Sequence, residues 1–206
     1  MQLSKIQLIM KFNVHPDIKK AETLPASFYK DKAVFEATKE KVFLNSWQWI
    51  GDEDLVPFSQ SVHPFVLLDG YLTEPLVLTK NKENEINCFT NVCTHRGNLV
   101  ALNPGKSRKL TCFYHGRRFN LNGEFEHMPE FEQTESFPRP CDNLHQFPIK
   151  KWSKFLFAGL NPAFDFQQVL DKMNERIGFL PLEEFSLDSS LSKEYLVHAN
   201  WALYCD

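Results

Sequence analysis

Apolar residues recur along this chain with two different periods, and the period changes near residue 47. From Asp31 to Asn45, apolar residues follow the three- and four-residue spacing of a helix, with lysines and glutamates between them. The same spacing returns at residues 166–173. Between these two segments the apolar runs are short and interrupted by turn residues. The pattern therefore predicts a β-rich unit between two helical flanks.

The central unit reads as a series of strands and tight turns. Val, Ile, Thr and Phe are common in its runs, and these residues favour strands. Asn122-Gly123 stands between two short apolar runs, which predicts a hairpin. A further extended stretch is expected at 193–198. The predicted strands are residues 65–68, 75–79, 85–90 and 155–160.

The change of period also predicts how the chain is organised. We expect an N-terminal helical segment at 1–46, an antiparallel β domain at 47–160 and a C-terminal helical part at 161–206. The expected fold class is therefore α+β. Internal repeats and low-complexity tracts are absent from the sequence.

Composition excludes several classes of protein. The 206 residues are 43% apolar and 24% charged, with a net charge of -3, which argues against a disordered chain and against one that mainly binds nucleic acid. Residues 1–12 lack the features of a signal peptide, and no later stretch approaches the roughly 20 apolar residues of a membrane helix. Five cysteines are an odd number for a disulfide framework, so we expect a cytoplasmic protein with free thiols.

Two short segments of the β domain each combine one cysteine with one histidine. The first reads Cys93-Thr94-His95-Arg96-Gly97, and the second reads Cys112-Phe113-Tyr114-His115-Gly116. The ligand pattern is C-x-H, a gap of 16 residues and C-x-x-H. Two thiolates and two imidazoles on two loops can surround a metal centre, and each glycine permits a tight turn beside it.

Two inorganic groups are compatible with this ligand set. A structural zinc ion accepts two cysteines and two histidines, but its usual spacings place like ligands close together. The mixed pairs match the Rieske pattern, in which two cysteines bind one iron of a [2Fe–2S] cluster and two histidines bind the other. Neutral imidazoles in place of two thiolates make such a cluster easier to reduce. The predicted ligands are Cys93, His95, Cys112 and His115, and no catalytic residue is predicted in this chain.

The wider sequence resembles the α subunits of Rieske non-haem iron oxygenases, the group of ring-hydroxylating dioxygenases and choline monooxygenase-like enzymes. The resemblance covers nearly the whole chain. It rests on C-T-H-R-G-N-L and C-F-Y-H-G-R-R-F-N-L-N-G-E-F, on W-Q-W-I-G at 47–51 and on N-W at 200–201. Arg117 stands where the family commonly has tryptophan, and Ala202 where it has lysine. Neither residue is expected to touch a ligand.

Three positions separate the chain from the respiratory branch of Rieske proteins. That branch resembles C-T-H-L-G-C and C-P-C-H-G-S, and a disulfide joins its two loops. Asn98 and Tyr114 occupy the positions of the disulfide, and Arg117 replaces a serine that bonds the cluster. We therefore expect a reduction potential toward the low end of the Rieske range of about -150 to +300 mV.

The resemblance implies electron transfer within a larger oxygenase. In the family, a ferredoxin or flavin reductase supplies the electron, and a mononuclear Fe(II) in a neighbouring subunit of a trimer activates dioxygen to hydroxylate a small molecule. The ligands of that iron follow the position where this chain ends, and Asp206 does not align with one of them. We therefore expect an oxygenase truncated at its C-terminus, which lacks the mononuclear iron site.

Two other classes of function stay open at this point. The chain could be a stand-alone Rieske ferredoxin-like carrier, although its long flanks argue against this, or a zinc-containing binding module. The segment between Cys93 and Phe119 is rich in basic residues and has no acidic one. It is expected either to attract an acidic electron donor, or else to offset the charge of a reduced cluster or meet a neighbouring subunit. Its basic residues are Arg96, Lys106, Arg108, Lys109, Arg117 and Arg118.

Overall fold

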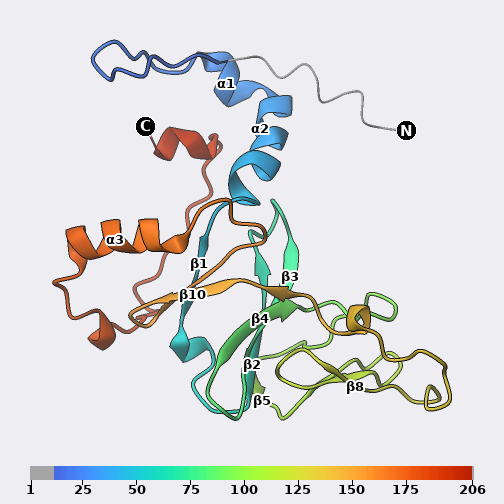
Figure 1. Cartoon of the computed structure of the whole chain (residues 1–206). Coiled ribbons are helices and arrows are strands. Elements are labelled where there is room, and N and C mark those ends of the chain that lie inside the picture. The colour runs from blue at the N-terminus through green and yellow to red at the C-terminus, as the bar shows by residue number, and fades with distance from the viewer. Residues whose placement is uncertain (1–11, 206) are drawn as a thin grey trace. The chain divides into compact units, whose positions relative to one another are not determined.

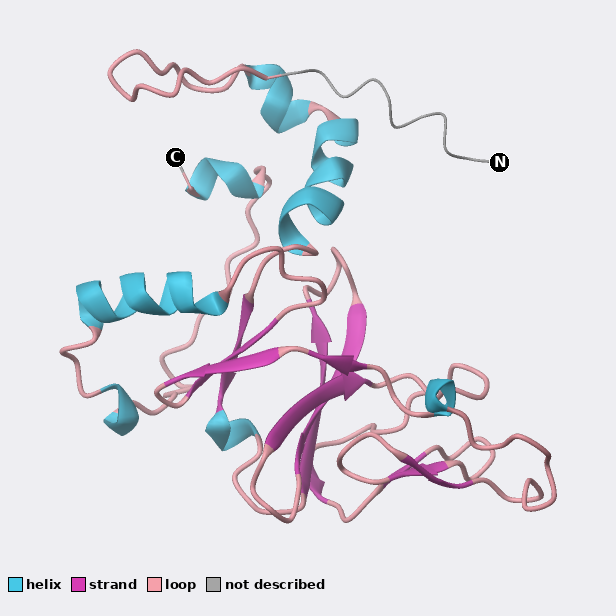
Figure 2. Cartoon of the chain, viewed as in Figure 1, coloured by secondary structure: helices cyan, strands magenta, loops and turns pink. Residues whose placement is uncertain are grey.

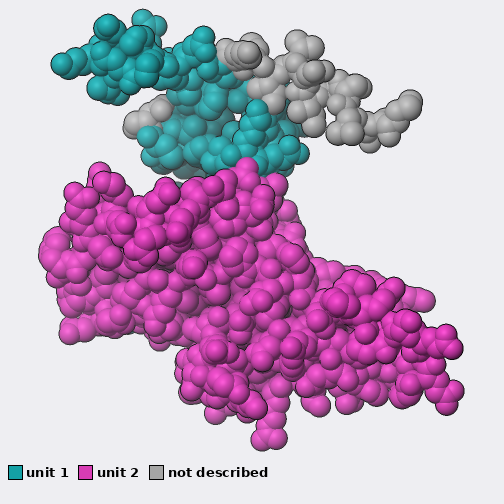
Figure 3. Space-filling view, viewed as in Figure 1, with its two compact units in different colours: residues 1–43, 186–206 teal, residues 44–185 magenta. Residues whose placement is uncertain are grey.

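The computed structural model describes residues 12–205, and internal contacts divide the chain into two compact units. Residues 44–185 form the larger unit, and residues 1–43 and 186–206 form the smaller one (Figure 3). The predictions made for residues 1–12 and for Asp206 concern positions outside the described residues, apart from residue 12. The three predicted domains divide the sequence at other positions and stay a prediction.

Three antiparallel sheets make up the strand structure in the described part of the larger unit (Figures 1 and 2). Their strand orders are β1-β11-β10, β5-β2-β3-β4-β9 and β6-β7-β8. The strands are β1 Gln48–Asp52, β2 Ser61–Leu67, β3 Glu74–Lys80, β4 Ile86–Thr90, β5 Gly105–Lys106, β6 Leu110–Thr111, β7 Arg118–Phe119, β8 Phe125–His127, β9 Gln146–Phe147, β10 Ile149–Trp152 and β11 Phe155–Ala158.

Strand β3 lies at the centre of the larger unit and is buried on both faces. Leu76 and Leu78 pack on one side, in a core that includes Leu156 and Ala158 of β11. Val77 points to the other side, into the core that also contains both predicted cysteine ligands. Because successive side chains of a strand point to opposite faces, one short strand connects the two cores. The core that contains the predicted cysteine ligands therefore packs against the five-stranded sheet.

The predicted hairpin at Asn122-Gly123 is present between β7 and β8. The backbone N–H of Asn120 donates to the carbonyl of Glu124 at 2.9 Å, and the side chain of Asn120 accepts from the backbone of Asn122 and Glu124. Gly123 has φ +77°, and a Cβ there would lie 2.5 Å from the ring of Phe89. Only glycine fits both the backbone conformation and the close approach to the sheet.

Both predicted helices are present, and each begins at an aspartate cap. The Asp31 carboxylate accepts from the backbone N–H of Ala33 at 2.7 Å, and that of Asp165 accepts from Gln167 at 3.0 Å. The helices are α1 Ala26–Lys30, α2 Lys32–Thr38 with a π-helical continuation Lys39–Phe43, α3 Phe166–Ile177, and 3₁₀ turns at Glu53–Leu55, Pro140–Asp142, Leu182–Glu184 and Trp201–Tyr204.

The smaller unit joins segments from both ends of the sequence. The side-chain amide of Asn200 donates to the carbonyl of Tyr29 at 3.1 Å, and the ring of Trp201 lies edge-on to that of Phe43, with centroids 5.0 Å apart. The N-W segment singled out in the sequence thus packs against the N-terminal helices. The stretch at 193–198 forms no strand and is exposed, because no described strand pairs with it.

None of the helices within residues 12–205 combines the length and the apolar character that a membrane crossing requires.

Candidate metal centre

The first predicted ligand loop is closed by two backbone hydrogen bonds. The N–H of Cys93 donates to the carbonyl of Asn98 at 2.8 Å, and the N–H of Gly97 donates to the carbonyl of Cys93 at 3.0 Å. Gly97 has φ +72°, a conformation that side-chain-bearing residues adopt at a cost. The loop therefore depends on glycine four positions after its cysteine.

The second ligand loop repeats this arrangement. The N–H of Cys112 donates to the carbonyl of Arg117 at 2.8 Å, and the N–H of Gly116 donates to the carbonyl of Cys112 at 2.9 Å. Gly116 has φ +74°, and a Cβ there would also lie 3.1 Å from Cγ of Pro129. The expectation that residue 117 touches no ligand is therefore wrong for its backbone, because its carbonyl binds the N–H of a predicted ligand.

The two loops bring all four predicted ligands together. Cys93 and Cys112 are buried, at 3% and 2% exposed, and they belong to the same core cluster. The imidazole rings of His95 and His115 are half-buried, with centroids 4.8 Å apart and planes inclined at 73°. The cysteines thus occupy the inner side of the site and the histidines the outer side.

Aromatic rings surround the histidine side of the site. The ring of Tyr114 lies 3.8 Å from that of His115 between centroids, and the ring of Phe131 lies 6.1 Å from that of His95. Tyr114 and Phe113 are themselves 59% and 77% exposed. The histidines are therefore shielded by aromatic side chains that remain open to solvent.

The two thiols differ in their pKa. Burial raises the pKa of Cys93, against an opposing effect of the positive charge on Arg117. Burial also acts to raise the pKa of Cys112, but hydrogen bonds from the backbone of Tyr114 and from the Asn98 amide outweigh it, so that pKa is lowered. The Asn98 amide nitrogen is 3.7 Å from the sulfur of Cys112.

His95 is prepared to act as a neutral ligand. Burial lowers its pKa, and the positive charges of His115, Arg96 and Arg117 lower it further. Its Nδ1 atom is buried and has no hydrogen-bond partner among the described residues. A metal ligand must offer an unprotonated nitrogen, and a buried nitrogen without a partner is otherwise unfavourable. The site chemistry therefore fits a bound metal group.

The donors of the site are arranged as two pairs, with the thiols on the inner side and the imidazoles on the outer side. A tetrahedral zinc site would need four donors around one point. A pair of thiols and a separate pair of imidazoles instead match a cluster with two irons, each holding two protein ligands.

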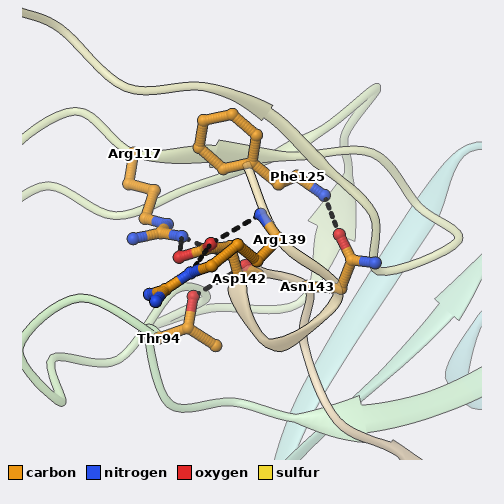
Figure 4. A network of polar contacts seen from close by, with 6 residues as sticks. All are labelled: Thr94, Arg117, Phe125, Arg139, Asp142 and Asn143. Carbon is orange, nitrogen blue, oxygen red and sulfur yellow. Dashed lines mark hydrogen bonds and ion pairs between the residues drawn. The ribbon is translucent and has the colours of Figure 1, made fainter. Parts of the chain in front are cut away.

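Arg117, one of the six basic residues of the segment between Cys93 and Phe119, is not available to attract an electron donor. It is 2% exposed, so of the alternatives for this segment only the others apply to it. Its Nη2 atom donates to Oδ1 of Asp142 at 2.7 Å and to the Asp142 carbonyl at 3.2 Å (Figure 4). The other five basic residues are not buried.

Asp142 is the residue near the site that sequence reasoning missed. Its backbone carbonyl also accepts from the hydroxyl of Thr94 at 2.8 Å, across 48 positions of sequence. Burial acts to raise the pKa of Asp142, but the hydrogen bonds from Arg117 and Arg139 outweigh it, and the pKa is lowered. No local spacing marks its role at the site, because Thr94 and Arg117 lie 48 and 25 positions away along the chain.

Comparison with known proteins agrees with this site. The family described as "Rieske [2Fe-2S] domain" matches residues 46–138. Chloroplastic choline monooxygenase of Arabidopsis thaliana is 24% identical over 210 residues, covering 97% of this chain and 49% of the relative. The carnitine monooxygenase oxygenase subunit of Acinetobacter baumannii is 29% identical over 213 residues, covering 95% of this chain and 52% of the relative. Residues 46–138 thus match a Rieske [2Fe-2S] domain, and the chain as a whole is similar to the oxygenase subunits of choline and carnitine monooxygenases.

Solved structures show the same fold as this chain. The quaternary ammonium Rieske monooxygenase CntA, in complex with L-carnitine, matches with a TM-score of 0.66 and 25% identity, over 77% of this chain and 46% of that one. Naphthalene 1,2-dioxygenase from Rhodococcus sp. matches with a TM-score of 0.62 and 21% identity, over 69% and 32%. The predicted fold class, with an antiparallel Rieske domain, is confirmed. The chain spans about half the length of the curated relatives it matches.

Proposed function

We propose that this chain holds a Rieske [2Fe–2S] cluster on Cys93, His95, Cys112 and His115 and forms the electron-transfer part of a non-haem iron oxygenase. One observation carries the proposal. Two loops with the same backbone hydrogen bonds bring a buried pair of thiols next to a half-buried pair of imidazoles. We also propose the domain division 1–46, 47–160 and 161–206.

Each group of side chains has a distinct task in this proposal. Cys93 and Cys112 hold the inner iron and keep it away from water, because both are buried. His95 and His115 hold the outer iron and provide the shorter path for an electron to and from the surface. When bound, the cluster supplies a site that accepts and releases one electron at a time.

For the longer protein we propose an oxygenase, with a mononuclear Fe(II) whose ligands lie outside this chain. Its electron donor is a ferredoxin or a flavin reductase, it assembles as a homotrimer in the cytoplasm, and it hydroxylates a small molecule. The relatives named for choline and carnitine support a quaternary ammonium substrate. Their similarity extends over 95% or more of this chain, into both flanks, which disfavours a stand-alone carrier.

Anaerobic reconstitution with iron and sulfide tests the proposal. We expect two irons and two acid-labile sulfides per chain, broad visible absorption, and a paramagnetic resonance signal on reduction with an average g below that of the free electron. Cys93→Ser should lose the bound iron, whereas Cys141→Ser, an exposed free cysteine, should keep it. A colourless protein that binds one zinc ion would contradict the proposal.

A further inference from the structure

Arg117 and Asp142 form a buried ion pair beside the proposed ligands. Their side chains are 3% and 8% exposed, and their closest charged atoms are 2.7 Å apart. The guanidinium lies over the rings of Phe125 and Phe137, at 4.9 Å and 5.5 Å from the centroids. Charges in such apolar surroundings interact more strongly than charges in water.

The pair connects the two ligand loops. Arg117 closes the second loop through its carbonyl, and its guanidinium reaches Asp142. The carbonyl of Asp142 accepts from Thr94, which stands between the two ligands of the first loop. Figure 4 shows Thr94 and Arg117 both directed toward Asp142. A single residue outside both loops therefore bonds to one residue of each.

Asp142 is itself held in a fixed orientation. Its Oδ2 atom accepts from the backbone N–H of Arg139 at 2.8 Å, at the start of the 3₁₀ turn Pro140–Asp142. The Arg139 side chain adds a longer contact of 3.4 Å from the exposed side. The carboxylate thus has no need to rearrange in order to meet the guanidinium.

The charge of Arg117 lies beside the proposed ligands. Arg117 follows His115 by two positions, its carbonyl accepts from the N–H of Cys112 at 2.8 Å, and its guanidinium is buried. A positive potential at these atoms favours a group that gains negative charge. A cluster gains one negative charge when it is reduced, so this potential favours the reduced form.

We propose that the Arg117–Asp142 pair is a positioning device that holds both ligand loops and sets the reduction potential of the cluster through its two opposite charges. The inference rests on the proposed ligand set. Arg117 favours reduction, and Asp142 limits that effect by partly cancelling its charge. The pair also joins the two loops by hydrogen bonds, at positions other than those of the disulfide in the respiratory branch.

A set of four variants of the reconstituted 206-residue chain tests the proposal. Arg117→Met and Asp142→Asn each remove one charge, the double variant removes both, and Thr94→Val removes the hydroxyl link without a change of charge. The potential is measured by redox titration with absorbance and paramagnetic resonance detection. The rate of iron release to a chelator is measured alongside it.

The proposal predicts potential shifts of opposite sign. Arg117→Met should shift the one-electron reduction equilibrium about tenfold toward the oxidised cluster, which is about 59 mV. Asp142→Asn should shift it toward the reduced cluster, and the double variant should return close to the unmodified chain. Thr94→Val should release iron faster with an unchanged potential. A pair that merely supports packing would give no such reversal of sign.

The outcomes separate this inference from the proposed function. If the unmodified chain assembles no cluster, the proposed function fails, and this inference fails with it. If that chain assembles a cluster but both single variants keep its potential, or shift it in the same direction, only this inference is overturned. If a single variant holds no iron, Arg117→Lys and Asp142→Glu decide. If both of these conservative variants retain iron, the proposal for the ion pair is supported. If both lose iron, the effect comes from packing, and the proposal is overturned.

Discussion

The two ligand loops have the same backbone hydrogen-bonding pattern but differ in the side chains that they attach to it. Each has a cysteine whose N–H is bonded to the carbonyl five positions later, and each has a left-handed glycine four positions later. The histidine stands two positions after the cysteine in the first loop and three in the second. The residue that closes the loop is exposed Asn98 in the first and buried Arg117 in the second.

This difference teaches that closing a loop and connecting it are separate tasks. The backbone carbonyl closes each loop, whatever side chain is attached. The side chain of Asn98 then reaches the sulfur of Cys112 on the other loop, and that of Arg117 reaches Asp142. A repeated backbone motif therefore gives two unequal halves of one site, each connected to its surroundings by its own side chain.

The largest effect is expected from making the histidine spacing of the two loops equal. The double variant Tyr114→His/His115→Tyr moves the second histidine to the position it has in the first loop. The backbone should accept it, but the imidazole would leave the place where it now meets His95, so we expect the bound iron to be lost. Iron analysis after reconstitution measures this, with Tyr114→Phe as the control that keeps its iron. Full iron content in the double variant would show that the spacing is unimportant.

A smaller but substantial effect is expected at the connection made by the second loop. Asp142→Asn leaves the Arg117 charge buried without a countercharge, which should cost about 3 kcal/mol of unfolding free energy near neutral pH. The pKa of Asp142 is lowered in the folded state, so its stabilisation is present above its unfolded pKa of about 3.9 and is lost as pH falls through the folded pKa. Urea unfolding of iron-free protein between neutral and acidic pH measures this.

The variant and the unmodified chain should thus approach each other in stability only under acid conditions. A constant difference across that whole range would contradict an ionised Asp142 in the folded state.

A moderate difference in stability is expected between alanine substitutions at Gly97 and at Gly116. Gly97→Ala adds a side chain at positive φ with no close neighbour, so it should cost about 1 kcal/mol, whereas Gly116→Ala also approaches Pro129 and should cost about 2 kcal/mol. Urea unfolding of the iron-free chain compares them. Gly70→Ala is the matched control, because Gly70 has φ +73° and open space around it. Equal costs at 97 and 116 would mean that Pro129 moves aside freely.

The smallest effect is expected at the connection made by the first loop. Asn98→Ala removes the amide near the Cys112 sulfur. The equilibrium constant for one-electron reduction of the cluster should fall by no more than about fivefold, because only one ordinary hydrogen bond is lost. In iron-free protein it should raise the pKa of Cys112, followed by thiolate absorbance against pH. Asn103→Ala, an exposed amide on the neighbouring segment, should change neither quantity. An unaltered Cys112 pKa would show that the Asn98 amide does not interact with the Cys112 sulfur.

The sequence predicts the two ligand loops because their information is local. Cys93 and His95 are two positions apart, and the glycines follow at fixed distances, so a short motif contains the whole loop. The hairpin at Asn122-Gly123 and the capped helices are local in the same sense. Their residues fix the backbone through nearest neighbours, and the structure confirms them.

What was missed depends on contacts between distant residues. Asp142 lies 25 positions from Arg117, and an ion pair across such a separation leaves no periodic pattern. Strands β9 and β10 are short, separated by Pro148, and exist because they pair with β4 and β11. The stretch at 193–198 has strand-like residues but no described partner, so it forms no sheet.

The hydrogen bond from Cys112 to the carbonyl of residue 117 has a consequence for how such proteins diverge. Because the carbonyl is common to all amino acids, this position can exchange its side chain without rebuilding the ligand loop. Arginine stands here where tryptophan is common in the family. An exchange at this one position, together with a distant acidic partner, would therefore change the charge beside the proposed cluster and leave the four proposed ligands in place.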